Sequence, residues 1–358
     1  MSSRRRFLQS TTFPALTAAV AGFTPLARAS SVSITVATGH PPVIPWVRVL
    51  NDYFIPEVDR RAAAAGHTIN WNRAYGGTVV KIGGELEAVQ KGIVDMSIVG
   101  APFHPNKLSL LNVAYYTPFA ALLVKDAVEV MDSIYPLAPG MRKLWEDHQQ
   151  VYLNGIGTDN FNLYTKRPVR QMRDLAGMKI GGAGPNLNWL KGSGAAGVVV
   201  TPPTIYNDLQ NGIYDGVLLG GSQATALKIH EVAPQMLKVD FGAMYWAGLT
   251  INKSRFTSMP PDLQQIFRDV ALLYRTRLCE EQERIALIGL EGMKKEGLTV
   301  TAVDRTARLA WAASLPDIAE EWAVPLEAKG QPARQVLLAW MDGLRSRGNP
   351  IARNWGRQ

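Results

Sequence analysis

The first third of the chain alternates between short apolar runs and longer segments with apolar residues at helical spacing. Apolar runs at 33–37, 68–72 and 96–99 predict three strands. The segments between them, 44–65 and 84–91, predict two helices. A strand–helix–strand–helix–strand order implies a parallel sheet with right-handed crossovers. The pattern therefore predicts an α/β fold.

The helix–strand unit that closes this series occurs a second time, 120 positions later. Gln, Gly, Ile, Asp and a final Gly stand at the same places in residues 87–100, EAVQKGIVDMSIVG, and residues 207–220, NDLQNGIYDGVLLG. In both copies the first Gly ends a helix and an apolar strand follows. The alternative is a chance match, because helix–Gly–strand units are common in α/β proteins. A true repeat predicts two similar lobes, and a cleft between lobes is a common place for a small ligand.

A glycine-rich segment lies between the two copies, at 177–190. We expect a short strand, then a loop containing Gly181, Gly182 and Gly184, then a helix that begins at Asn186. A loop with so little side-chain bulk lets a ligand approach backbone N–H groups closely.

The helical pattern is uninterrupted from 261 to 296. At about 1.5 Å per residue, such a helix is about 50 Å long, which is longer than one small domain. We therefore expect it to span both lobes. The expected lobes are residues 30–157 and 158–250. Residues 251–358 form the spanning helix and C-terminal helices, part of which joins the first lobe.

The N-terminal residues 1–29 have the three parts of an export signal. Arg4 and Arg5 lie in a basic region, an apolar region follows, and an Ala-x-Ala cleavage motif ends at Ala29. The paired arginines resemble the twin-arginine type of signal. The alternative, a basic N-terminal arm, explains neither the apolar region nor the cleavage motif. We expect a soluble periplasmic protein that begins near Ser30, because no later segment is long and apolar enough to span a bilayer.

Charge and composition exclude several function classes. The signal carries four arginines and no acid, so the formal net charge of +8 falls to +4 for the mature chain (8 − 4). This small excess, without a basic stripe interleaved with aromatics, argues against nucleic-acid binding. The single cysteine, Cys279, excludes an intramolecular disulfide and is expected to be a small buried hydrophobe. The five histidines fall at no metal-ligand spacing, so we expect neither a metal nor another cofactor.

From about residue 33 to 343, the chain resembles the solute-binding proteins of tripartite ATP-independent periplasmic (TRAP) transporters, the DctP-like family. Four segments carry the resemblance, namely residues 90–95, 174–180, 206–216 and 260–267. It implies an α/β binding protein with two parallel-core lobes, a hinge, a long connecting helix and an organic acid held between the lobes. The implied partners are a small and a large membrane subunit, and we expect the receptor itself to be a monomer.

Three positions depart from the family pattern. Gly181 stands where most of the family has an arginine that forks onto the ligand carboxylate, and Phe161 falls near a second frequent arginine. Leu219 replaces a polar anchor. Without a bidentate arginine, a strong planar hold on a carboxylate is lost. Space opened at Gly181 then favours a monocarboxylate with an apolar or aromatic body. The alternative is a C4-dicarboxylate with a relocated basic anchor, for which the candidates are Arg73, Arg167, Lys179 and Lys191.

The candidate ligand contacts follow from strand ends and from these departures. Ligands of parallel α/β sheets bind beyond the carboxyl ends of the strands, and aromatic or amide side chains near those ends suit an apolar acid. The candidates are His40, Tyr75, Phe103, Asn160, Phe161, Asn162, Gly181, Gly182, Asn186, Leu219, Tyr245 and Trp246. Backbone N–H groups and the asparagines would hold the carboxylate, and the aromatic residues would pack on its body.

No catalytic constellation competes with a binding role. The chain has no Gly-x-Ser-x-Gly elbow, no metal triad and no phosphate-loop lysine, so we expect no enzyme. A receptor that closes on its ligand needs convergent polar groups and a hinge, but no activated nucleophile. A subunit that signals to a membrane sensor requires the same closed surface, so the sequence leaves that alternative open. The receptor of an ATP-driven importer is disfavoured by the long helix.

Overall fold

The computed structural model of the chain describes residues 30–357, and the expected export signal, residues 1–29, lies outside the described residues. The strands are β1 (Ser31–Ala37), β2 (Thr68–Ala74), β3 (Met96–Gly100), β4 (Gln150–Thr165), β5 (Lys179–Gly182), β6 (Ala196–Val199), β7 (Gly216–Gly220), β8 (Gln235–Asn252) and β9 (Thr299–Ala302). The α-helices are α1 (Pro45–Val49), α2 (Ile55–Ala64), α3 (Glu85–Gln90), α4 (Val124–Ile134), α5 (Pro139–Glu146), α6 (Ile205–Gln210), α7 (Gly221–Ala226), α8 (Lys253–Thr257), α9 (Pro261–Lys295), α10 (Arg305–Ser314), α11 (Ile318–Glu327) and α12 (Ala333–Ser346). Shorter helical turns are η1 (Leu50–Phe54), η2 (Ala101–Phe103), η3 (Ser109–Tyr116), η4 (Met172–Leu175), η5 (Pro185–Leu190) and η6 (Ile229–Glu231).

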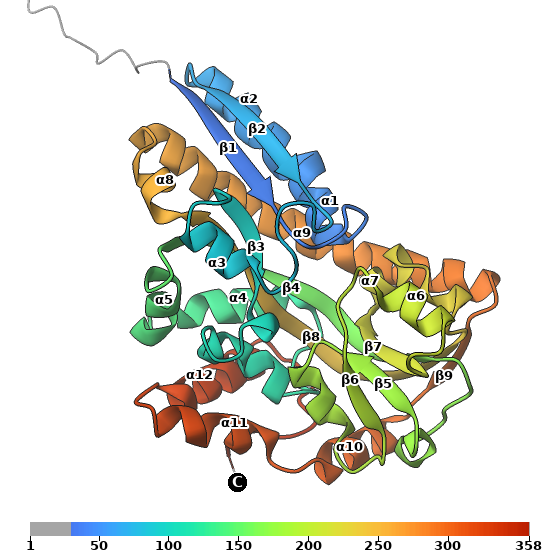
Figure 1. The fold of residues 1–358 in the computed structure, drawn as a ribbon. Helices are drawn as coiled ribbons and strands as arrows, with labels where there is room; N and C mark the ends of the chain where they lie inside the picture. Colours follow the sequence, from blue (N-terminus) through green and yellow to red (C-terminus); the bar gives the residue numbers. More distant parts are fainter. Residues whose placement is uncertain (1–29, 358) are drawn as a thin grey trace, which may run out of the picture.

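The strands form one mixed sheet in the order β2-β1-β3-β8-β4-β7-β5-β6, with β9 paired to β8 (Figure 1). The order is symmetric about its centre. Parallel strands β1, β2 and β3 form a first lobe, and parallel strands β5, β6 and β7 form a second. The long strands β4 and β8 pair antiparallel to each other and carry the chain between the lobes. The predicted α/β fold is confirmed, and the expected lobe boundary at 157/158 falls inside β4.

The two copies of the sequence repeat adopt the same structure. Gly92 and Gly212 both have positive φ angles, 69° and 74°, after α3 and α6. The Asp95 carboxylate then accepts the N–H of Thr35 at 2.8 Å, and the Asp215 carboxylate accepts the N–H of Lys179 at 2.8 Å. Each aspartate thus ties the turn before its own strand to the neighbouring parallel strand. The match at 120 positions is therefore a repeat of structure, with one copy in each lobe.

The long helix α9 has 35 residues and confirms the predicted spanning helix. It packs against α1 and α2 of the first lobe and against α7 of the second, and Figure 1 shows it crossing the molecule behind the sheet. A buried histidine is hydrogen-bonded near each end of α9, and the two histidines come from different lobes. His67 Nε2 lies 2.9 Å from Asp262 Oδ2 at the start, and His230 Nε2 lies 2.7 Å from Glu296 Oε2 just beyond the end.

The predicted loop at Gly181 and Gly182 is wrong. Both residues belong to β5, where Gly181 pairs with Val198 of β6 on one side and with Val217 of β7 on the other. Because β5 is a central parallel strand, its backbone groups serve the sheet ladders and not a ligand. Gly184, with φ 105°, is the glycine that makes the turn before η5.

Cys279 is buried in α9, as expected, and burial raises the pKa of its thiol to about 12. Within residues 30–357, no group of three or more His, Cys, Asp or Glu side chains is placed to hold a metal ion. None of the helices in that range combines the length and the apolar character needed to cross a membrane.

Candidate functional site

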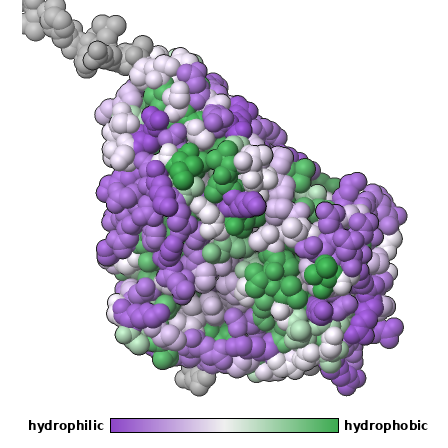
Figure 2. Space-filling model, viewed as in Figure 1, coloured by the Kyte–Doolittle hydropathy of each residue, from purple (hydrophilic) through white to green (hydrophobic). Residues whose placement is uncertain are grey.

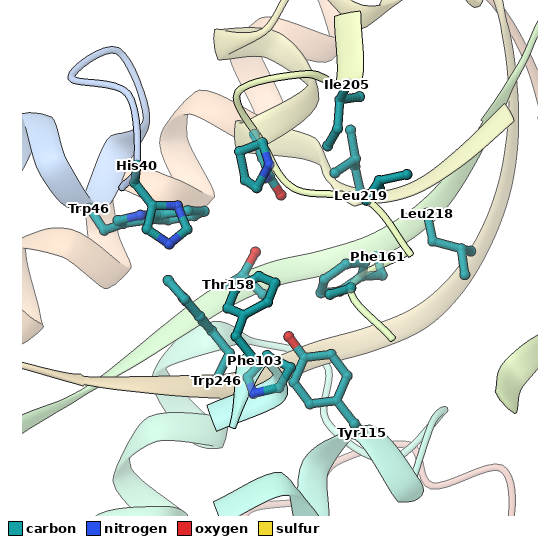
Figure 3. Close-up of a pocket in the computed structure, with 15 residues that line it drawn as sticks. His40, Trp46, Phe103, Tyr115, Thr158, Phe161, Ile205, Leu218, Leu219 and Trp246 are labelled. Atoms are coloured by element: carbon teal, nitrogen blue, oxygen red, sulfur yellow. The ribbon is translucent and has the colours of Figure 1, made fainter. Parts of the chain in front are cut away.

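A hollow lies between the two lobes, beyond the carboxyl ends of β3 and β7 and over the centre of β4 and β8 (Figure 3). The unfilled space of about 460 Å³ includes open solvent at the mouth of the hollow, so the enclosed part is much smaller. Figure 2 shows this face of the molecule with apolar side chains gathered near its middle and polar side chains around them. The hollow is lined by His40, Trp46, Pro102, Phe103, Tyr115, Thr158, Phe161, Ala183, Val200, Pro202, Ile205, Leu218, Leu219, Gln223 and Trp246.

The first-lobe wall is an aromatic cage around His40. The imidazole centroid lies 5.4 Å from the ring of Trp46, 5.2 Å from Trp246 and 6.3 Å from Phe103. Gly100 permits this packing, because a Cβ atom there would lie only 2.8 Å from the rings of both Phe103 and Trp246. A glycine at the end of β3 is therefore required by the cage.

The second-lobe wall is apolar. Leu218 and Leu219 project from β7, and Ile205 begins α6 (Figure 3). On the floor, Phe161 of β4 packs edge-on against Trp189 at 5.4 Å and near Tyr115 at 6.4 Å. These edge-on contacts hold Phe161 in place in an aromatic floor.

Several buried polar atoms of the lining have no hydrogen-bond partner among the described residues. They are both ring nitrogens of His40, the indole Nε1 atoms of Trp46 and Trp246, and Oγ1 of Thr158. Buried polar groups in folded proteins are nearly always paired. Unpaired atoms concentrated around one hollow therefore indicate the place where a ligand supplies the missing partner.

The lining is electrically neutral. It contains no Lys, Arg, Asp or Glu. Apart from its tyrosine and tryptophans, the polar residues in the lining are His40, Thr158 and Gln223. Burial lowers the pKa of His40 to about 3, so the imidazole is uncharged at neutral pH. The hollow thus offers N–H and O–H donors, but no fixed positive charge.

Two buried carboxyl groups that do not line the hollow accept hydrogen bonds from segments that carry lining residues. Glu85 accepts the N–H of Gly39 at 3.1 Å and of Gly83 at 2.7 Å, which anchors the segment carrying His40. Burial raises the pKa of Glu85 to about 7. In the second lobe, Asp159 accepts the N–H and the hydroxyl of Ser222 at the start of α7.

Five of the twelve candidates read from the sequence line the hollow, namely His40, Phe103, Phe161, Leu219 and Trp246. They come from both lobes and from both central strands. The strand-end rule and the departures from the family pattern therefore both point to residues that line this hollow.

The asparagine candidates are occupied elsewhere. Asn160 Oδ1 accepts the N–H of Gly242 at 2.9 Å, and Asn162 Oδ1 accepts the N–H of Asp240 at 2.9 Å. Both thereby hold an irregular stretch of β8. Asn186 is fully buried beside Gly182 with both side-chain polar atoms unpaired, but it does not line the hollow.

The two tyrosine candidates also lie outside the lining. Tyr245 is buried against α4, with its hydroxyl 3.4 Å from that of Tyr135, because it alternates with Trp246 along β8 and points to the opposite face of the sheet. Tyr75 follows β2 and packs on the first-lobe core with its hydroxyl unpaired.

The expected space at Gly181 is absent. A Cβ atom there would lie 3.1 Å from Val200 Cγ1 and 3.3 Å from Tyr214 Cε2. Valine and tyrosine therefore already fill the volume beside the glycine.

None of the basic residues considered as a relocated anchor lines the hollow. Arg73 donates to Asn51 on the exposed side of β2, and Lys191 pairs with Glu321. Lys179 and Arg167 are exposed.

Ten lining residues were missed by sequence reasoning. They are Trp46, Pro102, Tyr115, Thr158, Ala183, Val200, Pro202, Ile205, Leu218 and Gln223. The strand-end rule applied to β5 and β6 would have found Ala183, Val200 and Pro202, which follow these strands. The same rule applied to β7 would have found Gln223, which follows that strand. Tyr115 carried no such signal, because it reaches the hollow through tertiary packing of η3.

The family model for bacterial extracellular solute-binding protein, family 7, matches residues 73–324. The chain belongs to this family of TRAP periplasmic solute-binding proteins. Its members are transport receptors and not enzymes, so the sequence-based predictions of family, non-enzymatic role and periplasmic location are confirmed. A protein described as a solute-binding protein of Albidiferax ferrireducens is 24% identical over 258 residues, which cover 71% of each chain.

Solved TRAP receptors share the fold. One from Rhodoferax ferrireducens, in complex with copurified benzoate, has a TM-score of 0.78 at 18% identity, covering 88% of this chain and 98% of that one. A marine metagenome receptor specific for aromatic acid ligands has a TM-score of 0.79 at 15% identity, with 88% and 99% covered. A Bordetella pertussis receptor that binds pyroglutamic acid has a TM-score of 0.74 at 18% identity, with 87% and 99% covered.

Proposed function

We propose that this TRAP receptor captures an organic acid with one carboxylate and an aromatic or apolar body, and delivers it to the small and large membrane subunits. The observation that carries the proposal is the lining of the hollow, which has aromatic and aliphatic walls, unpaired N–H and O–H donors, and no charged side chain. We place the aromatic ring of the ligand between Phe161 and the cage around His40, where apolar contact would be the main source of affinity.

One carboxylate matches the supply of polar partners. Trp46, Trp246 and Thr158 each present an unpaired donor, and a hydrogen bond to a charged group contributes about 1.5–3 kcal/mol. A second carboxylate at the apolar end of the hollow would meet Leu218 and Leu219. Leaving a buried charge without a partner costs about 3–5 kcal/mol, so a dicarboxylate is rejected.

Two of the solved receptors that share the fold hold benzoate or are specific for aromatic acids, which agrees with the proposal. The pyroglutamic acid receptor aligns over nearly the same share of the chain, so the lining of the hollow carries the choice of ligand. The alternative, a C4-dicarboxylate held by a relocated basic anchor, lacks such an anchor among the lining residues. A ligand-binding subunit of a sensor system requires the same hollow. Membrane permease genes beside the gene for this chain would favour transport over sensing.

Thermal-shift measurements followed by titration calorimetry test the proposal. The probes are benzoate and 3-hydroxyphenylacetate against succinate and malate, all at one pH and ionic strength. At about 100 times its dissociation constant, a bound acid adds about 2.7 kcal/mol to the free energy of unfolding, which is a measurable rise in melting temperature. We expect the aromatic acids to bind and the dicarboxylates to give no shift. Tight succinate binding without a response to either aromatic acid would refute the proposal.

A substitution within the hollow links binding to this site. Ala183 lies in its wall, and Ala183→Leu would fill the space that the aromatic body needs. Ala302→Leu, at an exposed position in β9, is the matched control with the same change in side-chain volume. We expect the first variant to lose benzoate binding and the second to keep it. Equal affinity in the two variants would place the ligand elsewhere.

A further inference from the structure

His40 is the single ionisable base in the lining of the hollow, and it is completely buried with both ring nitrogens unpaired among the described residues. An anion that enters this space meets neutral donors only. We propose that His40 takes up one proton when the ligand's carboxylate enters, so that the acid and its neutralising proton bind together as an electroneutral unit. The inference rests on the proposed capture of a monocarboxylate.

The charge balance of the hollow requires such a partner. A carboxylate transferred from water into an apolar site carries a large desolvation cost unless it is both paired and hydrogen-bonded. The indole N–H groups of Trp46 and Trp246 and the hydroxyl of Thr158 can supply hydrogen bonds, but no lysine or arginine in the lining supplies the opposite charge. Protonated His40 would supply that charge at the site where the unpaired donors already converge.

The aromatic cage encloses the imidazole. The ring centroids of Trp46 and Trp246 lie 5.4 and 5.2 Å from that of His40, both in a T-shaped arrangement. Phe103 adds a third ring at 6.3 Å. The cage alone does not hold the proton, because burial lowers the pKa of His40 to about 3 in the free protein. The ligand carboxylate is the missing counter-charge.

The titratable groups nearest to His40 are few. Glu85 of α3 accepts the N–H of the adjacent Gly39, and burial raises the pKa of this carboxyl to about 7. Tyr75 and Tyr115, from β2 and η3, have pKa values raised by burial and stay neutral. Burial alone accounts for the lowered pKa of His40, with no contribution from a charged neighbour. Glu85 and Asp159, the two buried carboxyls behind the walls, have pKa values raised to about 7 and about 6 and are therefore the competing sites for proton uptake.

The sign of the pH dependence follows directly. Free His40 is neutral above about pH 3, and an ordinary carboxylic acid is ionised above about pH 4. The proposal requires that the bound carboxylate raise the pKa of His40 above 8, so that each bound ligand removes one proton from solution between pH 6 and pH 8. By linkage, the dissociation constant should increase tenfold for each unit of rising pH, or about 100-fold from pH 6 to pH 8.

Titration calorimetry with benzoate in buffers of different ionisation enthalpy measures the proton uptake of the wild-type chain. We expect about one proton per ligand and the tenfold change in dissociation constant per pH unit. His40→Gln keeps a neutral donor but cannot titrate, so its benzoate affinity should be independent of pH. His104→Gln is the control that should retain the uptake, because it removes another buried histidine that does not line the hollow.

The outcomes separate this inference from the proposed function. Benzoate binding with no proton uptake overturns the inference and leaves the proposed function standing. Uptake that persists in His40→Gln, or disappears in His104→Gln, overturns the role of His40. Failure of every aromatic acid to bind overturns both. If His40→Gln does not fold, nitrogen NMR of the wild-type histidines decides, because the His40 ring must change from the neutral to the imidazolium signature when benzoate is added.

Discussion

Replacing Thr158 by valine should stabilise the free receptor and weaken ligand binding at the same time. Thr158 lies in β4 at the floor of the hollow, is 3% exposed, and has a hydroxyl with no partner among the described residues. Thr158→Val replaces that hydroxyl by a methyl group of similar shape. The free protein then no longer buries an unpaired polar group, whereas the complex loses a donor to the carboxylate.

Both effects are large enough to measure. A buried unpaired polar group costs about 1–3 kcal/mol. Taking the lower end, we expect Thr158→Val to raise the free energy of unfolding by about 1 kcal/mol, or the melting temperature by about 2 °C. Loss of a hydrogen bond to a charged ligand costs about 1.5–3 kcal/mol, which weakens benzoate binding about 10- to 100-fold.

Two threonines of the same sheet provide matched controls. Thr165, also in β4 and fully buried, donates its hydroxyl to the carbonyl of Arg167 at 2.8 Å. Thr165→Val should therefore destabilise the protein by about 1 kcal/mol without changing affinity. Thr250 of β8 is fully buried with an unpaired hydroxyl but does not line the hollow, so Thr250→Val should stabilise the protein without changing affinity.

Denaturant unfolding without ligand and calorimetry with benzoate give the two readouts for all three variants. The reasoning fails if Thr158→Val destabilises the free protein as much as Thr165→Val does. It fails equally if Thr158→Val and Thr250→Val bind benzoate with the same affinity.

Three further predictions concern the walls and the motion of the lobes. Burial raises the pKa of Asp159 to about 6, so the folded protein holds a proton there that the unfolded chain has lost; this stabilisation is complete below about pH 4 and is lost as pH rises through 6. Asp159→Asn cannot titrate, so the stability of this variant should not fall over that pH range. In denaturant unfolding, the free energy of unfolding of Asp159→Asn relative to that of the wild type should therefore increase by about 3 kcal/mol from pH 4 to pH 7. Parallel pH profiles of the two proteins would contradict this. Gly100→Ala should push the rings of Phe103 and Trp246 into the hollow, which should destabilise the protein by about 1–3 kcal/mol and weaken benzoate binding about tenfold or more. An unchanged benzoate affinity in titration calorimetry would show that the rings have room to move. Small-angle scattering should show a smaller radius of gyration when benzoate is added, and a constant radius with a ligand shown to bind would count against closing lobes.

The sequence predicts those parts of the fold that depend on local chemistry. The glycine stops at Gly92 and Gly212 and the aspartates at Asp95 and Asp215 revealed the repeat, because each acts within its own turn or on the adjacent strand. The long helix was equally visible, since its pattern has no Gly or Pro interruption for many turns.

The strand β5 was misread because its conformation depends on its neighbours. A four-residue segment that ends in Gly181 and Gly182 has weak strand propensity. Pairing with β6 and β7 on both sides overrides that propensity. Val200 and Tyr214 fill the volume beside Gly181, and Asn186 and Leu187 fill the volume beside Gly182.

The candidate site could be predicted only where it depends on local features of the chain, such as the end of a strand. His40 and Phe103 follow strand ends, which place them at the rim of any parallel sheet. The asparagines of β4 looked like polar anchors, but the register of β4 against β8 turns Asn160 and Asn162 toward irregular backbone. Such register and alternation depend on long-range pairing, which a single sequence does not specify.

The central claim is an acid-binding site that uses no lysine or arginine. A crystal structure of the mature receptor with benzoate tests this claim most directly. We predict the ring between Phe161 and the aromatic cage, the carboxylate hydrogen-bonded to His40, and every lysine and arginine nitrogen farther than the roughly 4 Å of an ion pair from the carboxylate oxygens. A lysine or arginine nitrogen within that distance of the carboxylate would contradict the account.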